Sequence, residues 1–408
     1  MDQDVEEQIY PQFSRAERDR RWAAVRQAMA IEHLDVIVVP NNTGHSTDFQ
    51  ANVRWLTHVG GGGDADIAAV FPLEGSVTAI ANRPRTNWLS GAQNWTEDVR
   101  DGGRDFAKGT VARLKELKIE RGRIGVAGLG AGTRTPMGTI LLGFHRQLVE
   151  AFPNAELIDA TRLLDEIRHV KSDEEVAVLA KSQEIAEKAV AAEIAMARPG
   201  VKDWDLWAEV MATLVKNGSE LPVHCNWNSG PNVNYTRTRP SMRRLAHGDL
   251  IINEIEASWI GYRAQAYQPV FVGVADPLHQ ELIKLQRQVY EAIMERLRPG
   301  VTVGEIASLA ETVFARIAPK TGPAAGALCG LNMHGRGQGD DGPLITQIQR
   351  RPEQLAVVLK ENMVFILKPY IRTSDRSTEC SWGDTVVVTK NGGKRLGKRP
   401  HDLAVAKD

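Results

Sequence analysis

Two polar side chains lie eleven positions apart on a pattern typical of two strands joined by a turn. Glu254 comes before the turn and Gln265 after it. Only Glu254 can ionise, because an amide carries no charge at any pH. A lone carboxylate can take up a proton or orient a water molecule, whereas the amide can only exchange hydrogen bonds. Glu254 can therefore take part in acid–base chemistry, and Gln265 can exchange hydrogen bonds with a neighbouring group.

The elements that must position these residues occur twice in the second part of the chain. The tetrapeptide Arg-Pro-Gly-Val ends a long helical pattern at residues 198–201 and again at residues 298–301. Each copy is followed by a second helical pattern, at 204–217 and at 303–317, and then by strand patterns. This repeated order predicts a duplicated half-domain.

The first part of the chain alternates between helix and strand patterns. Residues 14–30 have the spacing of an amphipathic helix, with Ser14 placed to cap it. Apolar runs bounded by turn residues predict strands, and one further helical pattern follows them. The expected strands are 34–40, 68–72, 77–80 and 123–127, and the expected helix is 106–117. This order predicts an α/β domain.

A boundary separates the two parts. Ser172 followed three residues later by Glu175 is a capping box, and it begins a helical pattern over residues 173–197. We therefore predict an N-terminal domain over residues 1–165 and a second domain over residues 166–408.

Composition is typical of a globular protein with two cores. The chain has 408 residues, of which 42% are hydrophobic and 25% charged, and its formal net charge is −1. We expect neither nucleic acid nor an acidic membrane as a partner, because no global field would attract them. No apolar run approaches the ~20 residues of a membrane span, and no signal-peptide pattern begins the chain. The three cysteines are Cys225, Cys329 and Cys380, and their spacing is typical neither of a metal site nor of a disulfide framework. We therefore expect the protein to be located in the reducing cytoplasm.

Several ordered motifs resemble the creatinase, methionine aminopeptidase and aminopeptidase P superfamily. They include R-x-x-K-S-x-x-E at residues 168–175, N-V-R-W-L-T at 52–57, S-G-P-N at 229–232 and D-T-V-V-V-T at 384–389. The resemblance implies an α+β protein with a pita-bread catalytic domain and a smaller N-terminal creatinase-like α/β domain. It also implies a homodimer that acts on a small-molecule substrate.

The metalloenzymes of this superfamily bind two metal ions through Asp, Asp, His, Glu and Glu. The resemblance places these ligands, in order, at Glu254, Gln265, His334, Lys368 and Gly383. Only the histidine is retained, and the first acid is changed conservatively. Bridging carboxylates hold a metal pair, and a lysine ammonium is a cation without an acceptor, so it repels a metal. We therefore expect no metal and no other cofactor.

Metal-independent relatives of this kind imply a different chemistry. The resemblance to creatinase and ectoine hydrolase implies hydrolysis of a C–N bond, in which Glu254 activates water and His334 shuttles a proton. Two roles remain open for Lys368. It can pair with Glu254 and hold that carboxylate ionised, or it can bind a carboxylate of the substrate.

Further side chains are candidates for binding a carboxylated or zwitterionic substrate. They are Arg237, Gln265, Arg336, Asp341, Trp259, Tyr262 and Arg54. The arginines in the second part suit a carboxylate, and Asp341 suits a substrate ammonium or a salt bridge within the protein. The two aromatic residues can be site walls or core. Arg54 can act in its own subunit or across a dimer.

Three features near these residues have two readings each. His224 can replace the histidine that the superfamily often has where Arg237 stands, or it is structural. The glycine run at 60–63 can be a lid or a turn, and Asp340 can serve beside Asp341 or form a salt bridge.

Four functions compete on this sequence. A metal-independent hydrolase of a small C–N compound agrees with the altered ligand positions. A lyase of the dimethylsulfoniopropionate type and an Xaa-Pro aminopeptidase would both need the metal ligands that this chain lacks. A binding protein without catalysis would need none of them. Metal analysis and turnover separate these functions.

Overall fold

The computed structural model describes residues 11–41, 51–59, 67–82, 95–221, 225–237, 239–339, 341–346 and 350–407. The chain forms two compact units, residues 1–168 with 338–340, and residues 169–337 with 341–408. The predicted boundary after residue 165 lies inside helix α6 (Thr161–His169). The first unit ends at Arg168, one residue before the end of that helix.

The first unit is built on one mixed sheet of the described residues, in the order β4-β3-β2-β1-β5-β6. Its strands are β1 (Val36–Val39), β2 (Ile67–Pro72), β3 (Thr78–Ala81), β4 (Asp98–Asp101), β5 (Arg123–Val126) and β6 (Glu156–Asp159). The central strand β1 is antiparallel to β2 on one side and parallel to β5 on the other, which makes the sheet mixed. The predicted strands are all present.

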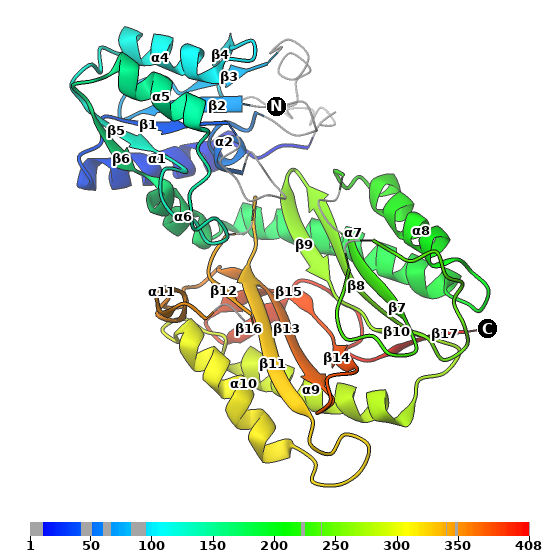
Figure 1. The fold of residues 1–408 in the computed structure, drawn as a ribbon. Coiled ribbons are helices and arrows are strands. Elements are labelled where there is room, and N and C mark those ends of the chain that lie inside the picture. The colour runs from blue at the N-terminus through cyan, green and yellow to red at the C-terminus, as the bar shows by residue number, and fades with distance from the viewer. Residues whose placement is uncertain are drawn as a thin grey trace, which may run out of the picture. The chain divides into compact units, whose positions relative to one another are not determined.

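Helices complete this unit (Figure 1). They are α1 (Arg15–Ile31), α2 (Ala51–Thr57), α4 (Phe106–Glu116), α5 (Leu142–Ala151) and α6. The predicted cap of α1 is confirmed, because the Ser14 hydroxyl accepts from Glu17 N at 3.1 Å. Phe106 and Leu114 of α4 and Leu148 of α5 pack on the buried valines of β1.

The second unit contains two antiparallel-rich sheets. The first has the order β17-β10-β8-β7 with β9 on β8, and the second has β12-β11-β13-β15-β16 with β14 on β13. Strands of the first sheet are β7 (Cys225–Gly230), β8 (Leu250–Trp259), β9 (Tyr262–Ala266), β10 (Val270–Val272) and β17 (Ala404–Ala406). Strands of the second are β11 (Leu328–Gly335), β12 (Leu344–Ile345), β13 (Val364–Arg372), β14 (Glu379–Ser381), β15 (Asp384–Thr389) and β16 (Gly392–Arg395).

A pair of long helices packs on each of these sheets. Helices α7 (Asp173–Met196) and α8 (Asp203–Lys216) share a core with β7 and β8. Helices α9 (Pro277–Arg296) and α10 (Val303–Ile317) share a core with β11 and β13. The short α11 (Pro352–Leu355) follows β12. The α+β class and the pita-bread architecture are therefore confirmed.

The duplication predicted from Arg-Pro-Gly-Val holds at the level of single backbone bonds. Gly200 N donates to Leu245 O at 2.8 Å, and Gly300 N donates to Leu359 O at 3.0 Å. The two glycines have φ of +85° and +89°, a left-handed conformation that favours glycine. The next bonds also match at 2.8 Å each: Leu245 N to Val201 O, and Leu359 N to Val301 O.

Strand register carries this duplication into the candidate site. Glu254 of β8 lies opposite Asn226 of β7, and Lys368 of β13 lies opposite Asn332 of β11. Both pairs join the second strand of a half-domain to its first strand. The acid and the lysine therefore occupy equivalent positions in the two halves.

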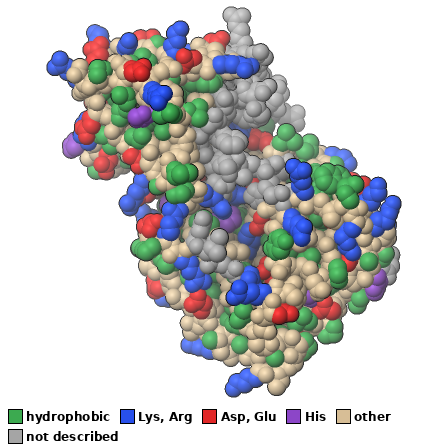
Figure 2. Space-filling view, viewed as in Figure 1, with side chains coloured by type: hydrophobic (Ala, Val, Ile, Leu, Met, Phe, Trp, Pro, Cys, Tyr) green, Lys and Arg blue, Asp and Glu red, His purple; other side chains and the backbone are tan. Residues whose placement is uncertain are grey.

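Two features are relevant to possible binding partners: the distribution of charge on the surface, and the length and apolar content of the helices. On the face of the first unit seen in Figure 2, acidic and basic side chains are interspersed. Among the described residues, no helix is both long and apolar enough to cross a membrane.

Candidate active site

An ion pair between equivalent strands forms the centre of the candidate site. Lys368 Nζ lies 2.5 Å from Glu254 Oε1 and 2.9 Å from Gln265 Oε1. The other oxygen of Glu254 accepts from Asn226 Nδ2 at 2.7 Å. The Lys368 side chain is 5% exposed and that of Glu254 is 19% exposed, so solvent reaches the carboxylate more readily than the ammonium. Both oxygens of Glu254 are thereby oriented, and a nearby ammonium stabilises its charged form.

Gly383 makes room for the lysine. A Cβ built on Gly383 would lie 3.0 Å from Leu367 O and even closer to Lys368 Cγ, within the range that Cβ atoms essentially never enter. Tyr267 forms a backbone bridge with Gly383, and its ring centroid lies 5.8 Å from Lys368 Nζ. Lysine at 368 and glycine at 383 are thus a sterically matched pair.

His334 lies on the same sheet face as Lys368. β11 pairs His334 with Ile366 and Asn332 with Lys368, so the histidine is one same-face position along from the lysine's partner. The imidazole is 7% exposed, and its Nδ1 lies 3.3 Å from Gly335 O. A proton on Nδ1 would leave Nε2 as the acceptor nitrogen.

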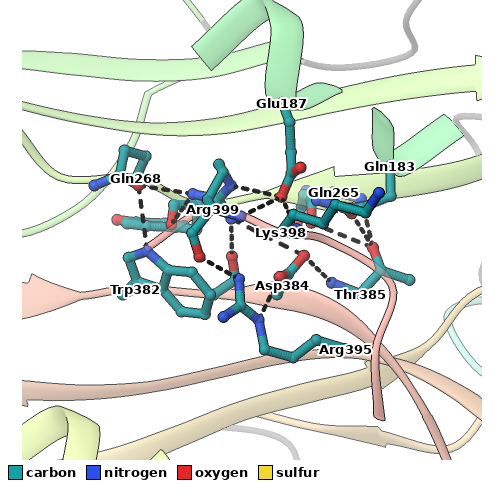
Figure 3. A network of polar contacts seen from close by, with 12 residues as sticks. Gln183, Glu187, Gln265, Gln268, Trp382, Asp384, Thr385, Arg395, Lys398 and Arg399 are labelled. Carbon is teal, nitrogen blue, oxygen red and sulfur yellow. Dashed lines mark hydrogen bonds and ion pairs between the residues drawn. The ribbon is translucent and has the colours of Figure 1, made fainter. Parts of the chain in front are cut away.

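A buried polar network, drawn in Figure 3, includes Arg399, which holds the backbone oxygen of Gly383. Arg399 Nη2 donates to Gly383 O at 2.8 Å, and its Nη1 donates to Gln268 Oε1 at 2.8 Å. Arg395 Nε donates to Asp384 Oδ2 at 2.9 Å. Burial raises the pKa of Asp384, and the two arginines oppose that rise. The network therefore ties β16 and the segment after it to Gly383 and to Asp384, the first residue of β15.

Comparisons with known proteins identify the family. Residues 177–390 match metallopeptidase family M24, and residues 21–170 match the creatinase/prolidase N-terminal domain. The M24 match spans more than half of the chain. The chain belongs to family M24. The resemblance seen in its motifs is confirmed.

Relatives of this M24 chain carry two kinds of name. It is 26% identical to an Xaa-Pro dipeptidase of Pyrococcus horikoshii over 83% of the chain and 90% of the relative. It is 23% identical to a creatinase of a Bacillus species over 97% of the chain and 93% of the relative. The crystal structure of an X-Pro aminopeptidase from Thermotoga maritima has a TM-score of 0.76 at 20% identity, covering 94% of the chain and 99% of that structure. The structural likeness confirms the fold.

The donor set of this M24 chain does not fit the metal pair that the family name implies. Lys368 Nζ stands within hydrogen-bond distance of Glu254 and Gln265, where metal ligands would have to converge. An ammonium there is a fixed positive charge without a lone pair. Within the described ranges, no three His, Cys, Asp or Glu side chains gather in a way that could hold a metal ion.

Two predicted substrate-binding residues are engaged inside the protein. Arg336 is ion-paired with Glu256, and Arg263 Nη1 lies 3.7 Å from the same carboxylate. Asp341 is ion-paired with Lys171 at 2.8 Å, with both side chains buried. The contacts of Asp341 agree with the salt-bridge alternative. Arg336 binds a carboxylate as expected, but the carboxylate belongs to Glu256.

Three others lie in surroundings that suit structural roles. Arg237 is exposed, and its guanidinium carbon lies 5.5 Å from the ring centroid of Tyr235. The buried Tyr262 hydroxyl donates to Glu175 on α7. Trp259 packs on the core between α7, α8 and the first sheet. For both aromatic residues these contacts agree with the core alternative, and a role as site walls stays a prediction.

Arg54 belongs to α2 of the first unit, where it is half-buried. Burial lowers the pKa of His58 to about 3, and the positive charge of Arg54 adds to that effect. Its role in substrate binding stays a prediction. His224, Asp340 and the glycine run at 60–63 lie outside the described residues.

Two side chains near the ion pair escaped the sequence analysis. Asn226 is fixed by strand register against Glu254, which the strand pattern alone could have indicated. Glu379 on β14 is buried, and burial raises its pKa to about 7. It stands at none of the family's ligand positions, so no motif pointed to it.

Proposed function

We propose that this chain hydrolyses a C–N bond of a small carboxylated or zwitterionic compound without a metal ion. The observation that supports this is the ammonium of Lys368, 2.5 Å from Glu254 Oε1 and 2.9 Å from Gln265 Oε1. It supplies, from the protein itself, positive charge at the place where the family's metal ligands converge. The creatinase relative aligns over 97% of the chain, which agrees with this reading.

Each side chain has a defined task in this reaction. Glu254 takes a proton from water as the water oxygen forms a bond to the substrate carbon. His334, in its protonated form, gives a proton to the nitrogen as the C–N bond breaks, and the proton that Glu254 took from water then passes to His334, which restores both residues. Lys368 stabilises the negative charge that develops beside Glu254, and Gln265 offers neutral hydrogen bonds. Of the predicted arginines in the second unit, Arg237 is exposed and can meet an anionic substrate group, whereas Arg336 is paired with Glu256.

A metallopeptidase acting on Xaa-Pro dipeptides is the second candidate. The names of the relatives favour it, since the Pyrococcus horikoshii protein is an Xaa-Pro dipeptidase. It would require Lys368 to leave Glu254, because the ammonium and a divalent cation cannot share that carboxylate at contact distance. A lyase and a binding protein without turnover remain further outcomes of the same assay.

The test is turnover by the purified protein, before and after treatment with a chelator. The panel comprises creatine-like guanidino acids, N-acyl amino acids and Xaa-Pro dipeptides, each with and without added manganese. We expect hydrolysis of a small carboxylated compound that survives the chelator. Cleavage of Xaa-Pro dipeptides that is lost with chelator and restored by manganese would reject the proposal. Thermal stabilisation without turnover would make the chain a binding protein.

A further inference from the structure

Glu379 is a buried carboxyl that the proposed reaction does not use. β14 holds it opposite Arg372 of β13, and Arg372 Nη2 donates to Glu379 Oε2 at 3.0 Å. Side chains alternate along a strand, so Arg372 and Lys368, four residues apart, project from one face of β13. The Glu379 carboxyl therefore belongs to the sheet face that carries the Glu254–Lys368 ion pair.

Further hydrogen bonds hold the backbone at Glu379 and its neighbour Thr378 in place. Glu379 N donates to Val233 O at 3.3 Å, and the neighbouring Thr378 hydroxyl donates to the same oxygen at 3.0 Å. His279 Nε2 lies 3.0 Å from that hydroxyl. The loop after β7 and helix α9 are thus both attached at the start of β14, which restrains the backbone that carries Glu379.

The charges around Glu379 include both members of the central ion pair. The pKa of Glu379 is raised to about 7, because burial and the charge of Glu254 raise it more than Arg372 and Lys368 lower it. Burial also raises the pKa of Tyr267, and the charges of Glu379 and Glu254 both add to that rise. The titratable and charged groups around Glu379 are Arg372, Lys368, Glu254, Tyr267, Cys380 and His279.

We propose that Glu379 is a positioning residue of the candidate site, which changes the charge beside the Glu254–Lys368 pair as it gains or loses a proton. Protonated, it adds no charge. Ionised, it favours the ammonium of Lys368 and makes Glu254 a stronger base, because a nearby negative charge opposes a second one. The inference rests on the proposed function in taking Glu254 as the base, and turnover should then rise through neutral pH.

The experiment follows the carboxyls directly in the full chain. Glutamate labelled with ¹³C at the carboxyl carbon is titrated by NMR between about pH 4 and 9. Glu379→Gln and Glu254→Gln identify the two resonances. We expect Glu379 to titrate near neutral pH and the Glu254 resonance to shift in the same step. That step should disappear from Glu254 in Glu379→Gln and persist in Glu361→Gln, which removes an exposed carboxyl just before β13.

A Glu254 resonance that is the same in Glu379→Gln and in the unaltered protein would overturn the inference. So would titration of Glu379 in the ordinary range of a glutamate. If Glu379→Gln does not fold, the unaltered protein decides, because absence of a shared step contradicts the coupling. The titration needs no substrate, so failure of the proposed hydrolysis and failure of this inference are read separately. In a turnover assay, Glu379→Gln should lose the rise in kcat through neutral pH and keep KM.

Discussion

Among single residues, the proposed reaction depends most on the carboxylate of Glu254 and the two side chains that hold it. Glu254 has one oxygen on Lys368 and the other on Asn226, at 2.5 and 2.7 Å. A carboxylate held at both oxygens is positioned for proton transfer without rearrangement, which is the condition for efficient general base catalysis. The same contacts predict what its removal should do.

Replacing Glu254 with glutamine should abolish turnover and spare the fold. The amide oxygen can still accept from Lys368, but the amide cannot take a proton from water. Positioned acid–base groups contribute about 10²–10⁴-fold, and we expect a loss of that size in kcat. The thermal midpoint checks the fold, and the exposed Glu361→Gln is the matched control. Turnover at the original rate in Glu254→Gln would remove this residue from the mechanism.

Protonation of Glu379 should make stability depend on pH. Its pKa is raised to about 7 from an ordinary 4.5, so the folded state holds a proton that the unfolded state has released between these values. Stability is therefore full below the unfolded pKa and is lost as pH rises towards 7, by roughly 3 kcal/mol at most. Glu379→Gln should be less sensitive across this range in urea unfolding. An equal pH dependence in both proteins would contradict the assignment.

The sequence predicted part of this residue-level picture. The ion pair between Lys368 and Glu254 was one of two roles expected for the lysine, and the contact is present. Glu379 could not be predicted, because its backbone partner Val233 and the charge of Glu254 that acts on it are distant in sequence. Likewise, the internal partners of Arg336 and Asp341 arise only once the strands and loops are assembled.

At the scale of elements, strand pairing decides which side chains meet. The ladder of β13 with β14 and β15 brings Gly383 against Lys368, and the Tyr267 bridge closes the other side. The observed position of the Lys368 side chain therefore requires a residue without a Cβ at position 383.

Gly383→Ala tests that dependence. The added methyl group would overlap Lys368 Cγ and press on Leu367 O, so we expect the lysine to shift away from Glu254. Overpacking of this kind costs about 1–3 kcal/mol, and turnover should fall with it. Gly143→Ala is the control, because nothing lies within 4 Å of the added atom. Unaltered stability and turnover in Gly383→Ala would mean that the site does not depend on this fit.

The two halves of the second unit make a further prediction. Gly200 and Gly300 have φ of +85° and +89° and open space around them. Alanine at either position should therefore meet only the backbone penalty, about 1–2 kcal/mol. Unfolding of the two variants in urea should give similar losses. A loss at only one position would show that the matching turns are not energetically equivalent.

Local signals explain which elements could be predicted. Helices α7 and α10 begin at capping boxes, Ser172 with Glu175 and Thr302 with Glu305, and such caps are readable in sequence. Predicted bounds of 173–197 and 303–317 agree with the helices found. The order of the strands and the three-residue β14 could not be predicted from the sequence, because both are set by pairing with other segments of the chain.

At the scale of the whole molecule, each unit has its own sheet system and core. The residues of the central ion pair all come from the second unit, which coincides with most of the M24 match at 177–390. Dimerisation, and any contribution of Arg54 to the site, stay predictions. Sedimentation equilibrium should give a homodimer mass of about twice 44.9 kDa. A monomer at micromolar concentration would contradict that expectation.

In the proposed site the ammonium of Lys368 takes the place of a metal ion, and the binding of manganese is the sharpest test of that role. Isothermal titration of Mn²⁺ into the metal-stripped full chain needs no knowledge of the substrate. We expect that the unaltered protein does not bind Mn²⁺ stoichiometrically, and that Glu254→Gln and His334→Ala give the same titration as the unaltered protein. Binding of one or two equivalents that is lost in those two variants would contradict it, because the ion would then occupy the position assigned here to the lysine ammonium.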